Sequence, residues 1–208
     1  TRSFEQIAAQ APGWMMGLVA DGGEPLKVTG ARASDNLFKT LGATAALGRT
    51  VEPGDSVPGR HRIVVLSDGL WRRRFAADPS VVGRTIQLDQ DALTVVGVMP
   101  PQFEIFEPGT DLWAPLPWEP GTSSFRTTFS QGVARLAPVV SIEAASRELQ
   151  GLSPNLRREL VRAADWGQTV RVASLQDTIT GDVRPALLIL LGAVGLILAQ
   201  QLDGDVAA

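Results

Sequence analysis

Few residues in this 208-residue sequence are of the types that carry out catalysis. There is no cysteine and one histidine, His61, so a serine–histidine–aspartate triad would have to be built around that residue. Ser67-Asp68 follows a short apolar segment, where a nucleophilic serine can lie between a strand and a helix. Both residues are also common helix caps, which is the favoured interpretation. Because His61 lies between two arginines in an expected exposed loop, a hydrolase would require it to pack beside Ser67 or an aspartate.

Two pairs of aspartates offer carboxylates for a cation or for acid–base chemistry. Asp89 and Asp91 flank an expected hairpin turn, and Asp177 and Asp182 precede an apolar run near the end of the sequence. Aspartate is common in turns, so a structural role is favoured for each. The sequence also contains no P-loop, no G-x-G-x-x-G and no G-x-S-x-G motif. We therefore expect no enzyme activity, no cofactor and no metal.

Five tryptophans are many for a chain of this length. Trp71 and Trp113 occur in apolar contexts that predict core positions. Trp118 and Trp166 occur in loop-like segments, and Phe125 follows in the same loop as Trp118. Tryptophan combines a large apolar ring with a polar N–H, and phenylalanine adds apolar surface, so these three aromatic residues are the candidates for a partner interface.

The charge pattern argues against nucleic acid as a partner. Lysine and arginine number 19 against 22 acidic residues, a formal net charge of −3, whereas nucleic-acid binding normally needs a basic face. Arginines cluster at 72–74 and 157–158, with acidic residues close by in each case. This mixture is typical of a solvated helix face.

The expected elements alternate between helices and short strands. Ser3 and Gln6 have capping-box spacing and predict a first helix, ended by Pro12-Gly13. Further helices are expected after Ser34, with a left-handed Gly42 at its end, after Ser67 or Asp68, after Ser141 and again from Ser153-Pro154. Strands are expected at Trp14–Val19, Leu26–Ala33, Ile63–Leu66, Thr85–Asp89, Leu93–Met99, Asp111–Leu116, Gly132–Leu136 and Thr169–Leu175, and Pro115 suggests that its strand lies at a sheet edge. Hairpins mixed with helices predict an α+β fold.

Two loops rich in proline, glycine or serine, at 48–60 and 117–128, suggest internal boundaries. A different feature marks the C-terminal part, where 186–199 is an uncharged apolar run of fourteen residues. A membrane helix needs about 20 residues, and Asp203 and Asp205 follow shortly afterwards. By itself, the run could be either a buried core helix or a truncated membrane segment.

Several longer runs together resemble the MacB-like periplasmic core domain of FtsX-type ABC permeases, and in particular the duplicated orphan permease subgroup. The central run is VVLSDGLWRRRFAADPSVVGRTIQLD, followed by TVVGVMPPQF and DLWAPL. The upstream runs are RSFEQIAA and VTGARASDNLFKTLGATAALGRTV, and the downstream runs are ARLAPVVSIEAASREL and GDVRPALLILLGAVGLIL. The resemblance covers nearly the whole chain.

The resemblance implies a non-catalytic domain between the first two membrane helices of a permease, facing the periplasm from the bacterial inner membrane. It implies a porter-like α/β-sandwich lobe from 1–59 and 121–183, an inserted and mainly β "sabre" lobe at 60–120, and the truncated start of a membrane helix plus a polar tail at 184–208. The implied role is to couple ATPase-driven motion of the membrane helices to substrate export or to envelope partners. The alternative is an envelope binding or assembly module that regulates a partner enzyme.

The same resemblance implies the partners. These are a cytoplasmic ABC ATPase, reached through the full permease, an envelope adaptor or substrate protein, and the membrane, reached through the flanking helices; the isolated domain would be a monomer. One departure from the family pattern concerns a turn, where Pro138-Val139 stands in place of an expected Pro-Gly.

Overall fold

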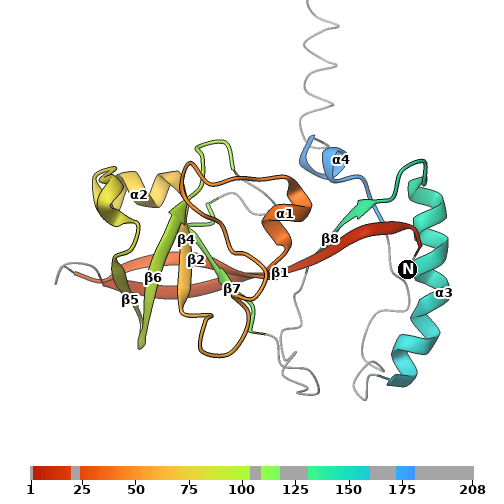
Figure 1. The fold of residues 1–208 in the computed structure, drawn as a ribbon, viewed down its shortest axis with the longest axis horizontal. Helices are drawn as coiled ribbons and strands as arrows, with labels where there is room; N and C mark the ends of the chain where they lie inside the picture. The colour runs from red at the N-terminus through yellow and green to blue at the C-terminus, as the bar shows by residue number, and fades with distance from the viewer. Residues whose placement is uncertain (1, 20–23, 104–108, 118–130, 160–171, 181–208) are drawn as a thin grey trace, which may run out of the picture. The chain divides into compact units, whose positions relative to one another are not determined.

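The computed structural model describes residues 2–19, 24–103, 109–117, 131–159 and 172–180 (Figure 1). The chain forms two compact units, Thr1–Val140 and Ser141–Ala208. The predicted α+β class is confirmed, because a mixed sheet and several helices make up these units.

The first unit is built around one eight-stranded sheet. Its strands are β1 (Phe4–Val19), β2 (Leu26–Ala33), β3 (Leu47–Gly48), β4 (Ile63–Leu66), β5 (Thr85–Leu88), β6 (Asp91–Val98), β7 (Leu112–Pro115) and β8 (Gln131–Leu136). Two helices, α1 (Leu37–Leu41) and α2 (Asp68–Phe75), and a 3₁₀ turn, η1 (Pro79–Val81), connect them.

Six of these strands form a closed ring of pairings in the order β1-β2-β7-β4-β6-β5, which returns to β1. The β2–β7 and β4–β6 pairs are parallel, and the other four are antiparallel. Closure satisfies backbone groups that an open sheet would leave exposed at its edges. The length of β1 makes this possible, because its first half pairs with β8 and its second half with β2 and β5.

The predicted first helix is wrong, because residues 4–19 form the single strand β1. Pairing with β8, more than a hundred residues away in sequence, replaces the local helical pattern. Pro12-Gly13 does not end the element either. The register shifts between Ala11 and Trp14, and Gly13 has φ +81°, so the two residues form a bulge within the strand.

The predicted hairpin at 85–99 is confirmed, with β5 and β6 paired in register from Thr85↔Thr94 to Leu88↔Asp91. The prediction that Pro115 marks an edge strand is wrong, since β7 lies between β2 and β4. Pro115 is the last residue of β7, and only the first two residues of that strand, Leu112 and Trp113, pair with β4. The missing N–H of the proline therefore removes no hydrogen bond to β4.

The start of α1 also differs from expectation. Its N-cap residue is Asn36 rather than Ser34, and the Ser34 hydroxyl instead accepts a hydrogen bond from the Ala9 N–H at 3.0 Å. Ser34 thus fixes the loop to β1. The predicted end of this helix is confirmed, because Gly42 has the left-handed φ of +70°.

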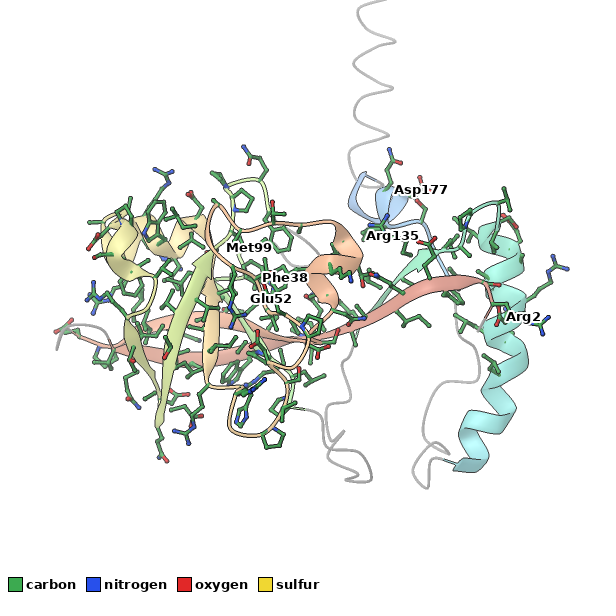
Figure 2. All side chains as sticks on the ribbon, viewed as in Figure 1. Arg2, Phe38, Glu52, Met99, Arg135 and Asp177 are labelled. Atoms are coloured by element: carbon green, nitrogen blue, oxygen red, sulfur yellow. The ribbon has the colours of Figure 1, made fainter. Side chains whose placement is uncertain are left out.

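The core has two clusters on opposite faces of the strands. One contains Met16, Leu18, Leu66 and Val95, and the other contains Phe38, Val65, Met99 and Trp113. Neighbouring residues Val64, Val65 and Leu66 are all fully buried, so β4 is covered on both faces. Figure 2 shows Phe38 and Met99 in the same part of the unit.

Strands on both sides of the predicted border at residue 60 belong to this one sheet. After the border come β4, β5, β6 and β7, which hydrogen-bond in one ring with β1 and β2. The division into a porter-like lobe and an inserted lobe at 60–120 stays a prediction.

The second unit contains α3 (Ile142–Glu159) and α4 (Leu175–Thr180). The Ser141 hydroxyl accepts a hydrogen bond from the Ala144 N–H at 3.2 Å, so the predicted cap is confirmed. The expected restart at Ser153-Pro154 is wrong, because α3 continues through these residues. Of the predicted strand at 169–175, residues 169–171 lie outside the described part, and Leu175 begins α4.

None of the helices in the described ranges is both long enough and apolar enough to cross a bilayer. The apolar run at 186–199 lies outside those ranges.

Candidate functional site

Ser67 is a helix cap, as predicted. Its backbone is extended, and its hydroxyl accepts a hydrogen bond from the Leu70 N–H at 3.1 Å. Its carbonyl accepts from Trp71, and its own N–H donates to the Asp111 carbonyl at 2.8 Å. The polar groups of Ser67 are thus used in starting α2 and fixing it to β7.

His61 does not join Ser67 in a catalytic pair. Its Nδ1 is buried and has no hydrogen-bond partner. Among the described residues, no hydrogen bond or ion pair joins His61 to Ser67 or to an aspartate. His61 therefore does not form, with Ser67 or a described aspartate, the hydrogen-bonded pair that a hydrolase would require.

Asp89 has a structural role in the hairpin turn. Its Oδ1 accepts a hydrogen bond from the Gly17 N–H at 2.7 Å, and its own N–H donates to the Gly17 carbonyl at 2.9 Å. Asp89 has φ +52°, a conformation that aspartate tolerates better than most residues. These bonds fasten the β5–β6 turn to β1 and account for the residue without a cation.

Of the two aspartates that precede the apolar run, one lies in the part of the chain that the structure describes. The Asp177 N–H donates to the Ser174 hydroxyl at 3.3 Å at the start of α4, and Asp182 lies outside the described residues. Within the described ranges, no three histidine or acidic side chains are grouped as metal ligands would be.

Two arginines of α2, Arg72 and Arg73, are paired with carboxylates. Arg72 Nε donates to Asp68 at 2.7 Å, an i, i+4 ion pair that raises the pKa of Arg72. Arg73 pairs with Asp111, which lies 38 positions further along the chain. The solvated-face prediction holds for Arg72, whereas Arg73 links α2 to β7. Residues 157–158 lie in α3.

Asp111 is a buried junction between elements. Only 7% of its surface is exposed, and its Oδ2 accepts a hydrogen bond from the Thr29 N–H of β2 at 3.0 Å. Its backbone N–H donates to the Thr29 carbonyl at 2.7 Å, and its carbonyl accepts from Ser67. The sequence does not reveal this junction, because its partners are far apart in the chain.

The tryptophans in apolar contexts are largely where the sequence predicts. Trp113 is buried and packs against Phe38 and Phe103, with ring centroids 6.2 and 5.2 Å away. Trp71 is half-buried, and its Nε1–H donates to the Asp78 carbonyl at 2.8 Å. The candidate interface residues Trp118, Phe125 and Trp166 lie outside the described residues, so their role stays a prediction.

The ring of Trp14 stacks against the cationic side chain of Arg32. The Arg32 guanidinium is 3.7 Å from the ring centroid and donates to the Pro115 carbonyl at 3.2 Å. Burial lowers the pKa of Arg32, and the charge of Asp91 opposes this effect. The stacked pair fastens β1 to β2 and β7.

A shallow hollow of about 320 Å³ lies where β1, β2 and the β5–β6 turn meet. Its lining residues are Met15, Met16, Gly17, Pro25, Lys27 and Asp89. Gly17 has no side chain to fill the space, and Met15 is 62% exposed. The lining combines the apolar side chains of two methionines and a proline with two opposite charges, and sequence reasoning did not single it out.

The comparisons with known proteins decide the family. The family model of the MacB-like periplasmic core domain matches residues 2–152. The chain belongs to this family. The match spans β1 to β8 and part of α3, so the resemblance stated from the sequence is confirmed.

Solved structures support the fold of this MacB-like domain. The periplasmic region of MacB from Actinobacillus actinomycetemcomitans aligns with a TM-score of 0.62 at 16% identity, covering 88% of this chain and 77% of the other. The extracellular domain of the noncanonic ABC-type transporter YknZ from Gram-positive bacteria aligns with a TM-score of 0.57 at 17% identity, covering 83% and 82%. No curated protein matches the sequence. The MacB-like domain is thus the extracytoplasmic type of domain that ABC-transporter permeases carry.

Proposed function

We propose that this MacB-like domain is a non-catalytic coupling module that faces the periplasm from the inner membrane. In a complete permease it conveys motion of the membrane helices, driven by a cytoplasmic ATPase, to an exported substrate or an envelope partner. The family match supports the permease context. The observation that carries the mechanical role is the closed ring of six strands.

A coupling module must move as a body rather than deform. In the first unit, closure removes free edges from the ring, and both faces of β4 are buried. Bonds between distant segments, including those of Asp111 and Asp89, reinforce the ring. Densely packed interiors deform little and transmit strain, so this unit suits the transfer of a displacement.

The joint at Val140 and Ser141, between the two compact units, is the place to test coupling. A short glycine–serine linker inserted there in a complete permease would behave as a flexible coil and absorb motion. We expect substrate export to fall while ATP hydrolysis continues. The matched control is the same linker inserted after Gly59, in an exposed loop within the first unit.

Export that is unaffected by the linker at the joint would contradict the coupling role. If export is unaffected and a pulldown instead recovers an envelope enzyme whose activity depends on the domain, the regulatory alternative is correct. Deleting residues 60–120 would be a poorer test, because it removes four of the six ring strands and with them the fold.

A further inference from the structure

The three methionines of this chain differ sharply in exposure. Met15 is 62% exposed, whereas Met16 is 3% exposed and Met99 is fully buried. Met15 and Met16 are neighbours in sequence, so they meet the same local concentration of any reagent. Burial is therefore the main difference between their sulfur atoms.

The strand β1 causes this difference. Successive side chains of a strand point to opposite faces, so Met16 enters the core cluster with Leu18 while Met15 faces outward. The outward neighbour two positions along is Gly17, which covers nothing, and the hollow beside it remains open. The Met15 thioether is thus approachable from solvent.

We propose that Met15 is a reversible oxidation site of this domain, modified by oxidants of the peroxide class. In the reaction, a sulfur lone pair attacks one peroxide oxygen, the S–O bond forms and the O–O bond breaks. The sulfur is oxidised by two electrons to the sulfoxide, and the second oxygen leaves as hydroxide and takes up the proton of the attacked oxygen to become water. Methionine sulfoxide reductases, supplied with a dithiol, reverse the change: the dithiol is oxidised to a disulfide and the oxygen leaves as water.

The fold accommodates the product at this position. The sulfoxide oxygen is a hydrogen-bond acceptor, and the hollow that Met15 lines is also lined by Lys27, whose ammonium is a hydrogen-bond donor. The same change at Met16 or Met99 would place a polar oxygen in an apolar core cluster, which is costly without a partner. Oxidation at Met15 therefore changes the chemistry of the hollow and leaves the core intact.

The test treats the folded 208-residue chain with dilute hydrogen peroxide and follows each methionine by tandem mass spectrometry. Fragment ions that separate Met15 from Met16 show which sulfur has gained one oxygen atom. If rates follow exposed area, the ratio of 62% to 3% predicts that Met15 reacts about 20-fold faster than Met16. Incubation with both sulfoxide reductases should return the chain to its original mass.

Three controls make the result decisive. In urea the three methionines should react at similar rates, and M15L should lose the fast phase of oxidation. The chain oxidised only at Met15 should keep the thermal midpoint of the untreated chain. Equal rates at Met15 and Met16 in the folded chain would overturn the proposal, as would a lowered midpoint or an oxidised mass that the reductases do not reverse.

Discussion

Gly97 of β6 lies against backbone on the side where a side chain would stand. A Cβ built there meets the Arg49 carbonyl oxygen at 2.1 Å and the Leu47 carbonyl oxygen at 2.8 Å. Its partner in the register is another glycine, Gly48 of β3. Because real Cβ atoms essentially never come within 3.0 Å of such neighbours, the contact at 2.1 Å requires a shift of about 0.9 Å in G97A.

The shift would disrupt the hydrogen bonds that hold the β3 segment to β6. The Ala46 N–H donates to the Val98 carbonyl at 2.8 Å, and the Arg49 N–H donates to the Val96 carbonyl at 2.9 Å. A displacement of nearly 1 Å breaks both, at a net cost of about 1 kcal/mol each. Overpacking against rigid backbone adds about 1–3 kcal/mol. We therefore expect Gly97→Ala to destabilise the domain by about 3–5 kcal/mol.

Urea unfolding followed by tryptophan fluorescence measures this loss, since Trp113 is buried in the same unit. The control is Gly132→Ala in β8, where a Cβ meets nothing within 4 Å and φ is not positive. That variant should change the free energy of unfolding by no more than about 1 kcal/mol. A loss below about 1 kcal/mol in Gly97→Ala would refute the close approach of β3 and β6.

Three further predictions concern single side chains. Val139 has φ +61° and a fully exposed side chain, so Val139→Gly should relieve about 1–2 kcal/mol of strain. After an entropy cost of about 0.5–1 kcal/mol, a net stabilisation of up to about 1.5 kcal/mol should appear as a higher urea midpoint, and a lower one would contradict the left-handed turn. Asp111→Ala leaves the partly buried Thr29 N–H without its acceptor and should cost about 2–3 kcal/mol in the same assay. Arg73→Ala, at a side chain 46% exposed, should cost at most about 1 kcal/mol, and equal losses would show that the ion pair rather than the buried bond stabilises the junction. Hydrogen bonds from the Ser80 hydroxyl and N–H lower the pKa of Asp78, so this carboxylate favours the folded state above its unfolded-state pKa and loses that effect as pH falls through the lowered value. NMR titration of Ser80→Ala should show that pKa moving back up, and an unchanged value would exclude the hydroxyl as its main cause.

Sequence patterns predicted the elements that depend on neighbouring residues. The β5–β6 hairpin, the Ser67 and Ser141 caps and the left-handed Gly42 all follow from short-range geometry, and the structure confirms each. These features are decided within a few residues of where they occur, so a local pattern contains the necessary information.

The elements that were predicted wrongly depend instead on residues that are distant in sequence. The helix expected after Ser3 is part of β1, because pairing with β8 outweighs a local capping pattern. Pro12-Gly13 is a bulge rather than an end, because the partner strand β2 continues past it. A local pattern contains no information about a partner strand that is distant in sequence, and propensity is only a weak prior against such pairing.

The same reasoning explains why the candidate site was harder to predict than the fold. Asp111 looked like an ordinary residue at a strand start, and its importance comes from Thr29 and Arg73, which are brought to it by ring closure. Met15 is distinctive because β1 directs its side chain outward, next to Gly17, which has no side chain. Both features arise from the β1–β2–β7 region of the ring. If closure of this ring gives the domain its stiffness, substitutions at Asp111 should weaken coupling in a complete permease in proportion to their loss of stability. Oxidation of Met15, on the outer face of the same ring, should leave coupling unchanged.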